Sequence, residues 1–237
     1  MVQVSRVYPT SLTSFKKCSQ QWSYSQQPDL PVLPMEQDVL LFGSAVHQAI
    51  EAYYAKIDEN PRPVQIDTLA KQMFADFVGS QFRYLKQRYE NCVTNFIRFE
   101  TERLKKFKVY KPTLVERKLQ DGILGGKMDA YFQTDQTVLD WKTGSPSMGE
   151  ELTIQGAFYR KVLNDLNMPC TRVLFVDLNH GKVLEAPAVT DAWLQAQVDY
   201  MLQGEVKPSP GPWCNYCGFV IRCEFSRNGI GNMWSLC

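Results

Sequence analysis

Two carboxylates and a lysine occur in adjacent segments, residues 125–132 and 137–144, that read as β-strands joined by a turn at 134–136. Because side chains alternate between the faces of a strand, Asp140 and Lys142 point to one side and Trp141 to the other. If the strands pair, Asp129 lies close to Asp140. Neighbouring carboxylates repel unless a cation lies between them, and oxygen ligands suit Mg²⁺ or Mn²⁺. Lys142 adds a positive charge that a phosphate or an activated water could use.

The Asp-x-Lys tripeptide is common by itself, and an exposed hairpin with ordinary surface charges is the alternative interpretation. An Asp followed after a short gap by Asp-x-Lys on paired strands resembles the core of the PD-(D/E)XK nucleases. That resemblance implies an α/β fold with a restriction-endonuclease-like core, in which helices flank a mixed central sheet in the order α-β-β-β-α-β. Met128 stands where the name-giving Pro would precede the first acid, and the second acid is Asp140 instead of Glu. Neither departure removes a group that the chemistry needs.

Residues 43–58 predict a helix capped by Ser44, with His47 and Glu51 four positions apart on one face. A single helical histidine is usually a surface or hydrogen-bonded core residue. The pattern Gly-x-x-x-His-x-x-x-Glu, however, resembles the helix that RecB-like nucleases place before their core strands. The resemblance implies that His47 joins the metal site and that Glu51 lies beside it.

Two further patterns are similar to RecB-like nucleases. Val115-Glu116 precedes the Gly-x-x-Asp strand, so Glu116 either supports the site or is a surface residue. Downstream of Lys142, Gln155 and Tyr159 are four positions apart on one face of a helix predicted over 149–166. By resemblance, the amide orients a water or Lys142, and the phenol contacts phosphate.

The C-terminal region carries a metal-ligand pattern, Cys214-x2-Cys217, followed by Cys223 six residues later. These are three local ligands, and because no second close pair exists, Cys18 near the other terminus is the natural fourth. The arrangement resembles the iron-sulfur RecB-like exonucleases, which include CRISPR-associated exonucleases and AddB-type nuclease domains. The resemblance implies a structural iron-sulfur cluster, 4Fe-4S in preference to 2Fe-2S, shielded by aromatic residues; a zinc site is the alternative. Cys92, Cys170 and Cys237 are not expected to be ligands, and Gly218 replaces the Pro that many members carry after the Cys pair.

Composition allows a large core and gives no global drive toward nucleic acid. The chain has 237 residues, 44% of them hydrophobic, and a net charge of +1. Binding to DNA therefore needs a local basic patch. The lysines at 105, 106, 108 and 111 are either such a patch or a solvated helix end. No run is apolar enough for a membrane and no signal peptide is evident, so we expect a cytoplasmic protein with reduced or metal-bound cysteines.

Periodicity completes the expected architecture. Residues 64–109 read as helical throughout, 113–119, 171–178 and 183–185 as strands, and 191–202 as a final helix. We expect a single nuclease domain over residues 1–237. Its parts are an N-terminal segment (1–42), a helical region (43–110), the core (111–186) and the cysteine-bearing C-terminal region (187–237).

Together these patterns predict an Mg²⁺- or Mn²⁺-dependent deoxyribonuclease. By resemblance, His47, Asp129, Asp140 and the Trp141 carbonyl hold the ion, and Lys142 stabilises the transition state. The family implies an exonuclease on single-stranded DNA ends, 5′ to 3′, with CRISPR adaptation or recombination proteins as partners. The alternatives are a structure-specific endonuclease and a non-catalytic single-stranded-DNA-binding module with a structural metal site.

Overall fold

A computed structural model describes residues 5–27, 29–30, 37–79, 81–144, 146, 149–220 and 222–223, with only the backbone of residues 37, 83 and 216. The helices are α1 (Pro9–Lys17), α2 (Ser19–Ser25), α3 (Gln37–Lys56), α4 (Pro63–Phe74), α5 (Lys86–Arg103), α6 (Glu150–Asp165) and α7 (Asp191–Gln203). The strands are β1 (Leu114–Asp121), β2 (Leu124–Phe132), β3 (Thr137–Lys142), β4 (Arg172–Asp177) and β5 (Lys182–Glu185). Short π and 3₁₀ turns lie at Ala75–Gly79, Arg83–Leu85 and Pro212–Tyr216.

The five strands form one mixed sheet in the order β1-β2-β3-β4-β5. Neighbouring strands are antiparallel except β3 and β4, which are parallel and are connected through α6. The α-β-β-β-α-β core predicted from the sequence is therefore confirmed. Among the described residues, no helix has the length and apolarity needed to cross a bilayer.

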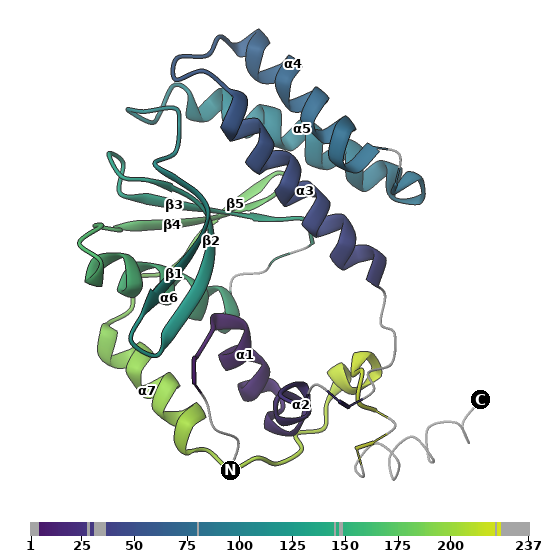
Figure 1. The fold of residues 1–237 in the computed structure, drawn as a ribbon, viewed down its shortest axis with the longest axis vertical. Coiled ribbons are helices and arrows are strands. Elements are labelled where there is room, and N and C mark those ends of the chain that lie inside the picture. The colour runs from purple at the N-terminus through teal and green to yellow at the C-terminus, as the bar shows by residue number, and fades with distance from the viewer. Residues whose placement is uncertain are drawn as a thin grey trace.

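Helices cover both faces of the sheet (Figure 1). One core packs α3, α4 and α5 against Leu139 and Trp141 of β3. The other packs α1, α6 and α7 against Val138 of β3 and Phe175 of β4. Alternate residues of β3 thus enter different cores, as the strand period requires. Trp141 lies on the face opposite Asp140 and Lys142, as predicted.

Two sequence predictions about helices were wrong. Helix α3 begins at Gln37, so Ser44 does not cap it; the Ser44 hydroxyl lies inside the helix and donates to the Leu40 carbonyl at 3.1 Å. A serine hydroxyl can donate to a carbonyl of the preceding helical turn as well as cap the N-terminus of a helix. The region 64–109 is not one helix, because a π turn at Ala75–Gly79 and a 3₁₀ turn separate α4 from α5, and α5 ends at Arg103.

A buried ion pair joins α5 to the sheet. Arg103 donates from Nε and Nη2 to the two oxygens of Glu100 at 2.9 and 2.6 Å, and both side chains are almost completely buried. The guanidinium lies between the rings of Tyr110 and Phe132, 4.3 Å from each ring centroid. Tyr54 also donates to Glu100, at 2.9 Å. Each buried charge therefore depends on its partner.

We expect Glu100→Gln to lower the free energy of unfolding by about 3 kcal/mol, because it leaves the Arg103 charge buried without a counter-ion. Urea denaturation measures the change. Glu102→Gln is the matched control, since Glu102 is exposed and lies 3.7 Å from Lys106; we expect a loss below about 0.5 kcal/mol there. Equal losses in the two variants would contradict the assignment.

Candidate active site

Strand β2 leaves β3 at Asp129, and this departure creates the site. The β2–β3 ladder contains only the pairs Ala130↔Leu139, Tyr131↔Val138 and Phe132↔Thr137. Beyond them, Asp129 Oδ2 accepts the Trp141 backbone N–H at 2.7 Å, in place of a strand carbonyl. Because the N–H and C=O of a strand residue point to the same neighbour, the Trp141 carbonyl is directed to the Asp129 side as well.

His47, Glu116 and Asp129 form one cluster, with one ligand atom from each lying within 4.8 Å of the others. His47 Nδ1 is 3.2 Å from Glu116 Oε1 and 3.4 Å from Asp129 Oδ1. Glu116 has φ +48°, which is uncommon outside glycine and which turns its carboxylate toward α3 at the point where β1 and β2 lose regular pairing. Backbone strain of this kind concentrates at functional sites.

The electrostatics of the cluster favour an added cation. Burial would lower the pKa of His47, but the carboxylates of Asp129, Glu116 and Asp140 outweigh it and raise that pKa to about 10. Burial and the charge of Asp140 raise the pKa of Asp129. The carboxylates therefore favour the protonated form of His47, and Asp129 resists its own ionisation. A divalent ion bound among these groups would stabilise the ionised form of Asp129.

Asp140 and Lys142 lie on the same face of β3, and α6 holds both. Lys142 Nζ is 2.8 Å from Asp140 Oδ1 and donates to Gln155 Oε1 at 2.9 Å. Gln155 Nε2 donates to Asp140 Oδ2 at 2.8 Å, and the Tyr159 hydroxyl lies 2.8 Å from the same oxygen. The Tyr159 hydroxyl is also 2.9 Å from the Lys127 carbonyl, so its one proton is shared between two acceptors. Burial, then the Asp140 charge, raises the pKa of Tyr159 well above its ordinary value.

This geometry predicts different effects for the two α6 side chains. Gln155→Ala removes the amide that bridges Asp140 and Lys142, so we expect at least about a tenfold loss of kcat. Tyr159→Phe keeps the ring and removes one hydrogen bond, so we expect a smaller loss with unchanged thermal stability. Steady-state nuclease assays and melting curves check both. Unchanged kinetics in both variants would leave the pair a purely structural feature of the helix.

The donor set fits a small divalent ion. The cluster offers one imidazole nitrogen and the oxygens of Glu116 and Asp129, with the Trp141 carbonyl directed to the same side. Asp140 is not among the clustered ligands, but its charge acts on Asp129. Asp140 Oδ1 is buried and accepts no aligned hydrogen bond, although Lys142 Nζ is near it. An oxygen-rich set with one nitrogen suits Mn²⁺ or Mg²⁺ better than a soft metal.

Two residues beside the cluster differ from expectation. Glu51 is exposed and is not among the clustered ligands; it lies within electrostatic range of Lys127. Lys127, which sequence reasoning did not select, forms an ion pair with Glu116. The available signal was its position two residues before Asp129 on the same strand.

Four cysteines from the two ends of the chain gather at one small cavity: Cys18, Cys214, Cys217 and Cys223, with Trp213 and Phe219 in its lining. Cys18 joins α1 to α2, and its sulfur accepts the Ser209 N–H at 3.5 Å. Cys92 and Cys170 are buried in the two separate cores. Cys237 lies outside the described residues.

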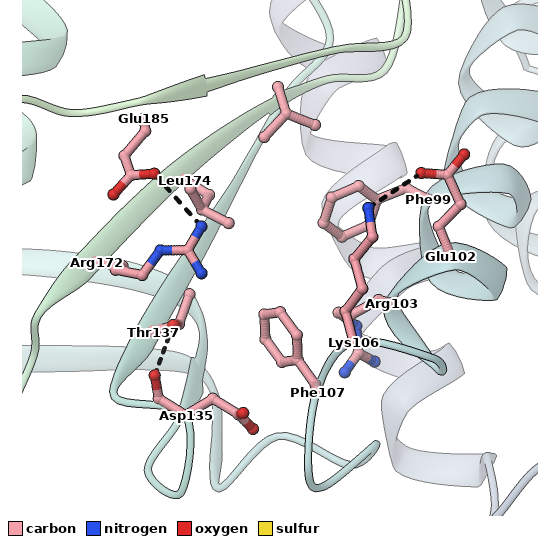
Figure 2. A pocket seen from close by; sticks show the side chains of 11 residues that line it. Phe99, Glu102, Arg103, Lys106, Phe107, Asp135, Thr137, Arg172, Leu174 and Glu185 are labelled. Atoms are coloured by element: carbon pink, nitrogen blue, oxygen red, sulfur yellow. Dashed lines mark hydrogen bonds and ion pairs between the residues drawn. The ribbon is translucent and has the colours of Figure 1, made fainter.

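A different cavity, of about 330 Å³, opens between the C-terminal end of α5 and the start of β3 at Thr137 (Figure 2). Two exposed ion pairs face each other across it, Glu102 with Lys106 and Arg172 with Glu185. The loop carrying the lysines at 105, 106, 108 and 111 is joined to the β2–β3 turn, where Lys108 N–H donates to Asp135. This lysine cluster therefore lies at the end of β3 remote from Asp140 and Lys142.

Comparison with known proteins identifies the family. Residues 6–224 match the family model for the PD-(D/E)XK nuclease superfamily, so the chain belongs to that superfamily. Among solved structures, the chain is similar to the one titled "Crystal structure of SSO0001", at 15% identity, with 79% of this chain and 97% of that chain covered and a TM-score of 0.38. A comparison with curated proteins found no match. Superfamily membership indicates a metal-dependent nuclease with DNA as its substrate.

Proposed function

We propose that this protein is an Mg²⁺- or Mn²⁺-dependent DNA exonuclease of the RecB-like group, acting on single-stranded ends in the 5′ to 3′ direction. The observation that carries the proposal is the continuous arrangement around Asp129, Asp140 and Lys142. Clustered ligands lie on one side of it, and the α6 amide and phenol lie on the other. A surface hairpin with ordinary charges would not need Gln155 to bridge an acid and a lysine.

His47, Asp129, Asp140 and the Trp141 carbonyl would hold the ion, with Glu116 as a supporting ligand. When bound, a divalent ion activates water and neutralises charge on the scissile phosphate. The Lys142 ammonium, held between Asp140 and Gln155, is positioned to donate hydrogen bonds to charge that develops on the phosphate oxygens. Tyr159 and Gln155 orient Asp140 by binding its Oδ2.

The cysteine site is proposed to hold a 4Fe-4S cluster with a structural role, uniting residues 1–237 as one nuclease domain. The gathering of Cys18, Cys214, Cys217 and Cys223 at one cavity lined by Trp213 and Phe219 supports this proposal. A zinc ion held by four thiolates is the alternative. CRISPR adaptation proteins or recombination proteins are the proposed partners, by the RecB-like resemblance.

The test is digestion of linear single-stranded DNA labelled at either end, with Mn²⁺, Mg²⁺ or EDTA. The proposal expects metal-dependent release of short products from the 5′ end first. Cleavage of circular single-stranded DNA would favour an endonuclease. Binding without cleavage under all metal conditions would favour a non-catalytic DNA-binding module.

A further inference from the structure

The β1–β2 hairpin extends beyond the rest of the sheet (Figure 1). Because β2 pairs with β3 only from Ala130 to Phe132, residues 117–128 form a two-stranded arm. On one face of the arm, Leu119 and Met128 are buried in the core with α1 and α6. Lys118 and Lys127 lie on the other face, and both are exposed.

These two lysines are register partners, directly opposite each other in the antiparallel pair. Like charges in this position destabilise a hairpin unless a negative group lies over them. Lys127 is paired with Glu116. Among the described residues, no carboxylate forms an ion pair with Lys118 within 4.0 Å. The charge of Lys118 is therefore available to bind an anion.

A third cation lies on the same face. Gly125 is two residues before Lys127, so a side chain there would point the same way. A Cβ at Gly125 would meet Arg6 Cδ at 2.5 Å, which places the Arg6 side chain across this face. Arg6 Nε is buried and has no hydrogen-bond partner. The bridge between Val7 and Leu124 holds Arg6 beside the strand.

The three cations lead toward the acidic cluster. Gly125, where Arg6 lies, and Lys127 are about 6.6 Å apart along one face of β2, and Lys118 lies beside Lys127 on the neighbouring strand. Lys127 interacts electrostatically with Asp129, so its end of the row adjoins the ligand group. The lysine cluster at the far end of β3 lacks this continuity.

We propose that Arg6, Lys118 and Lys127 form a phosphate track that binds the backbone of the DNA strand leading into the site. The inference rests on the proposed function, because it assigns the path of that reaction's substrate. The track recognises phosphodiesters and does not read bases. It makes contact before the scissile phosphate is reached, so its loss weakens binding and leaves the chemical step intact.

The test measures binding of a labelled single-stranded oligonucleotide in EDTA by fluorescence anisotropy, across a range of salt concentrations. Each phosphate contact contributes about 0.7 to the slope of log K against log salt for single strands. We expect Lys118→Gln to lower the slope by about 0.7, and Arg6→Gln with Lys118→Gln to lower it by about 1.4. Lys118→Arg should retain the slope. In steady-state assays, Lys118→Gln should raise KM several-fold with kcat unchanged.

Lys182→Gln is the matched control, an exposed lysine on β5 at the opposite edge of the sheet. If the slopes of the Lys118→Gln and Arg6→Gln variants equal that of wild type, the track does not exist. An equal decrease in Lys182→Gln would show only a general effect of charge and would also overturn the proposal. If the variants show the expected slope changes but the wild-type protein never cleaves DNA, the proposed nuclease is refuted and the track is supported.

Discussion

Asp140→Asn is expected to lower kcat for DNA cleavage by at least about 10³-fold, which corresponds to about 4 kcal/mol of transition-state stabilisation. The substitution keeps the size of the side chain and removes the negative charge. It also disrupts a bonded set, because Asp140 contacts Lys142, Gln155 and Tyr159. Lys142→Met should produce a loss of similar size by removing the ammonium that we propose stabilises charge on the phosphate. End-labelled single-stranded DNA with Mn²⁺ as cofactor provides the measurement.

The control for this loss is Glu185→Gln, which removes an exposed carboxylate of the same sheet, 3.4 Å from Arg172. We expect its kcat to match wild type. DNA binding in EDTA should be retained in the Asp140 and Lys142 variants, which separates lost chemistry from lost folding. Near-wild-type digestion by both variants would mean that the catalytic centre lies elsewhere.

The sequence alone was sufficient to predict the parts of the fold that depend on local periodicity. The two-residue period of β3 placed Trp141 opposite Asp140 and Lys142, and the four-residue spacing of Gln155 and Tyr159 placed both on one face of α6. The Ser44 cap was wrong because a serine hydroxyl can bond the preceding turn as well as begin a helix.

Other features depend on contacts between distant segments and have no local signal. The bond from the Trp141 N–H to Asp129 exists only because β2 leaves β3 at that residue. Glu116 joins His47 through a backbone angle of φ +48° that the residue type does not predict. The ion pair of Lys127 with Glu116 follows from the same break in the hairpin, which explains why sequence reasoning passed over that lysine.

The cysteine site should have the largest effect on stability, because it joins the two ends of the chain. Cys18 lies between α1 and α2, and its sulfur shares a cavity with Cys214, Cys217 and Cys223. Closing a loop of roughly 200 residues restricts the unfolded chain by about 4–5 kcal/mol, and the metal–thiolate bonds add to this. The site also brings Ser19 and Lys207 together, where the Lys207 N–H donates to the Ser19 hydroxyl at 2.9 Å.

Cys18→Ser should therefore lower both cluster content and thermal stability about as much as Cys217→Ser does. Anaerobically purified wild-type protein should be brown and contain iron and acid-labile sulfide, whereas zinc without sulfide would identify a four-thiolate zinc site. Cys92→Ser and Cys170→Ser are the controls for colour, since both thiols are buried away from the cavity. Cys237→Ser is expected to keep the colour as well. A brown, stable Cys18→Ser protein together with a bleached Cys237→Ser protein would make Cys237 the fourth ligand, and the chain would then not be closed through Cys18.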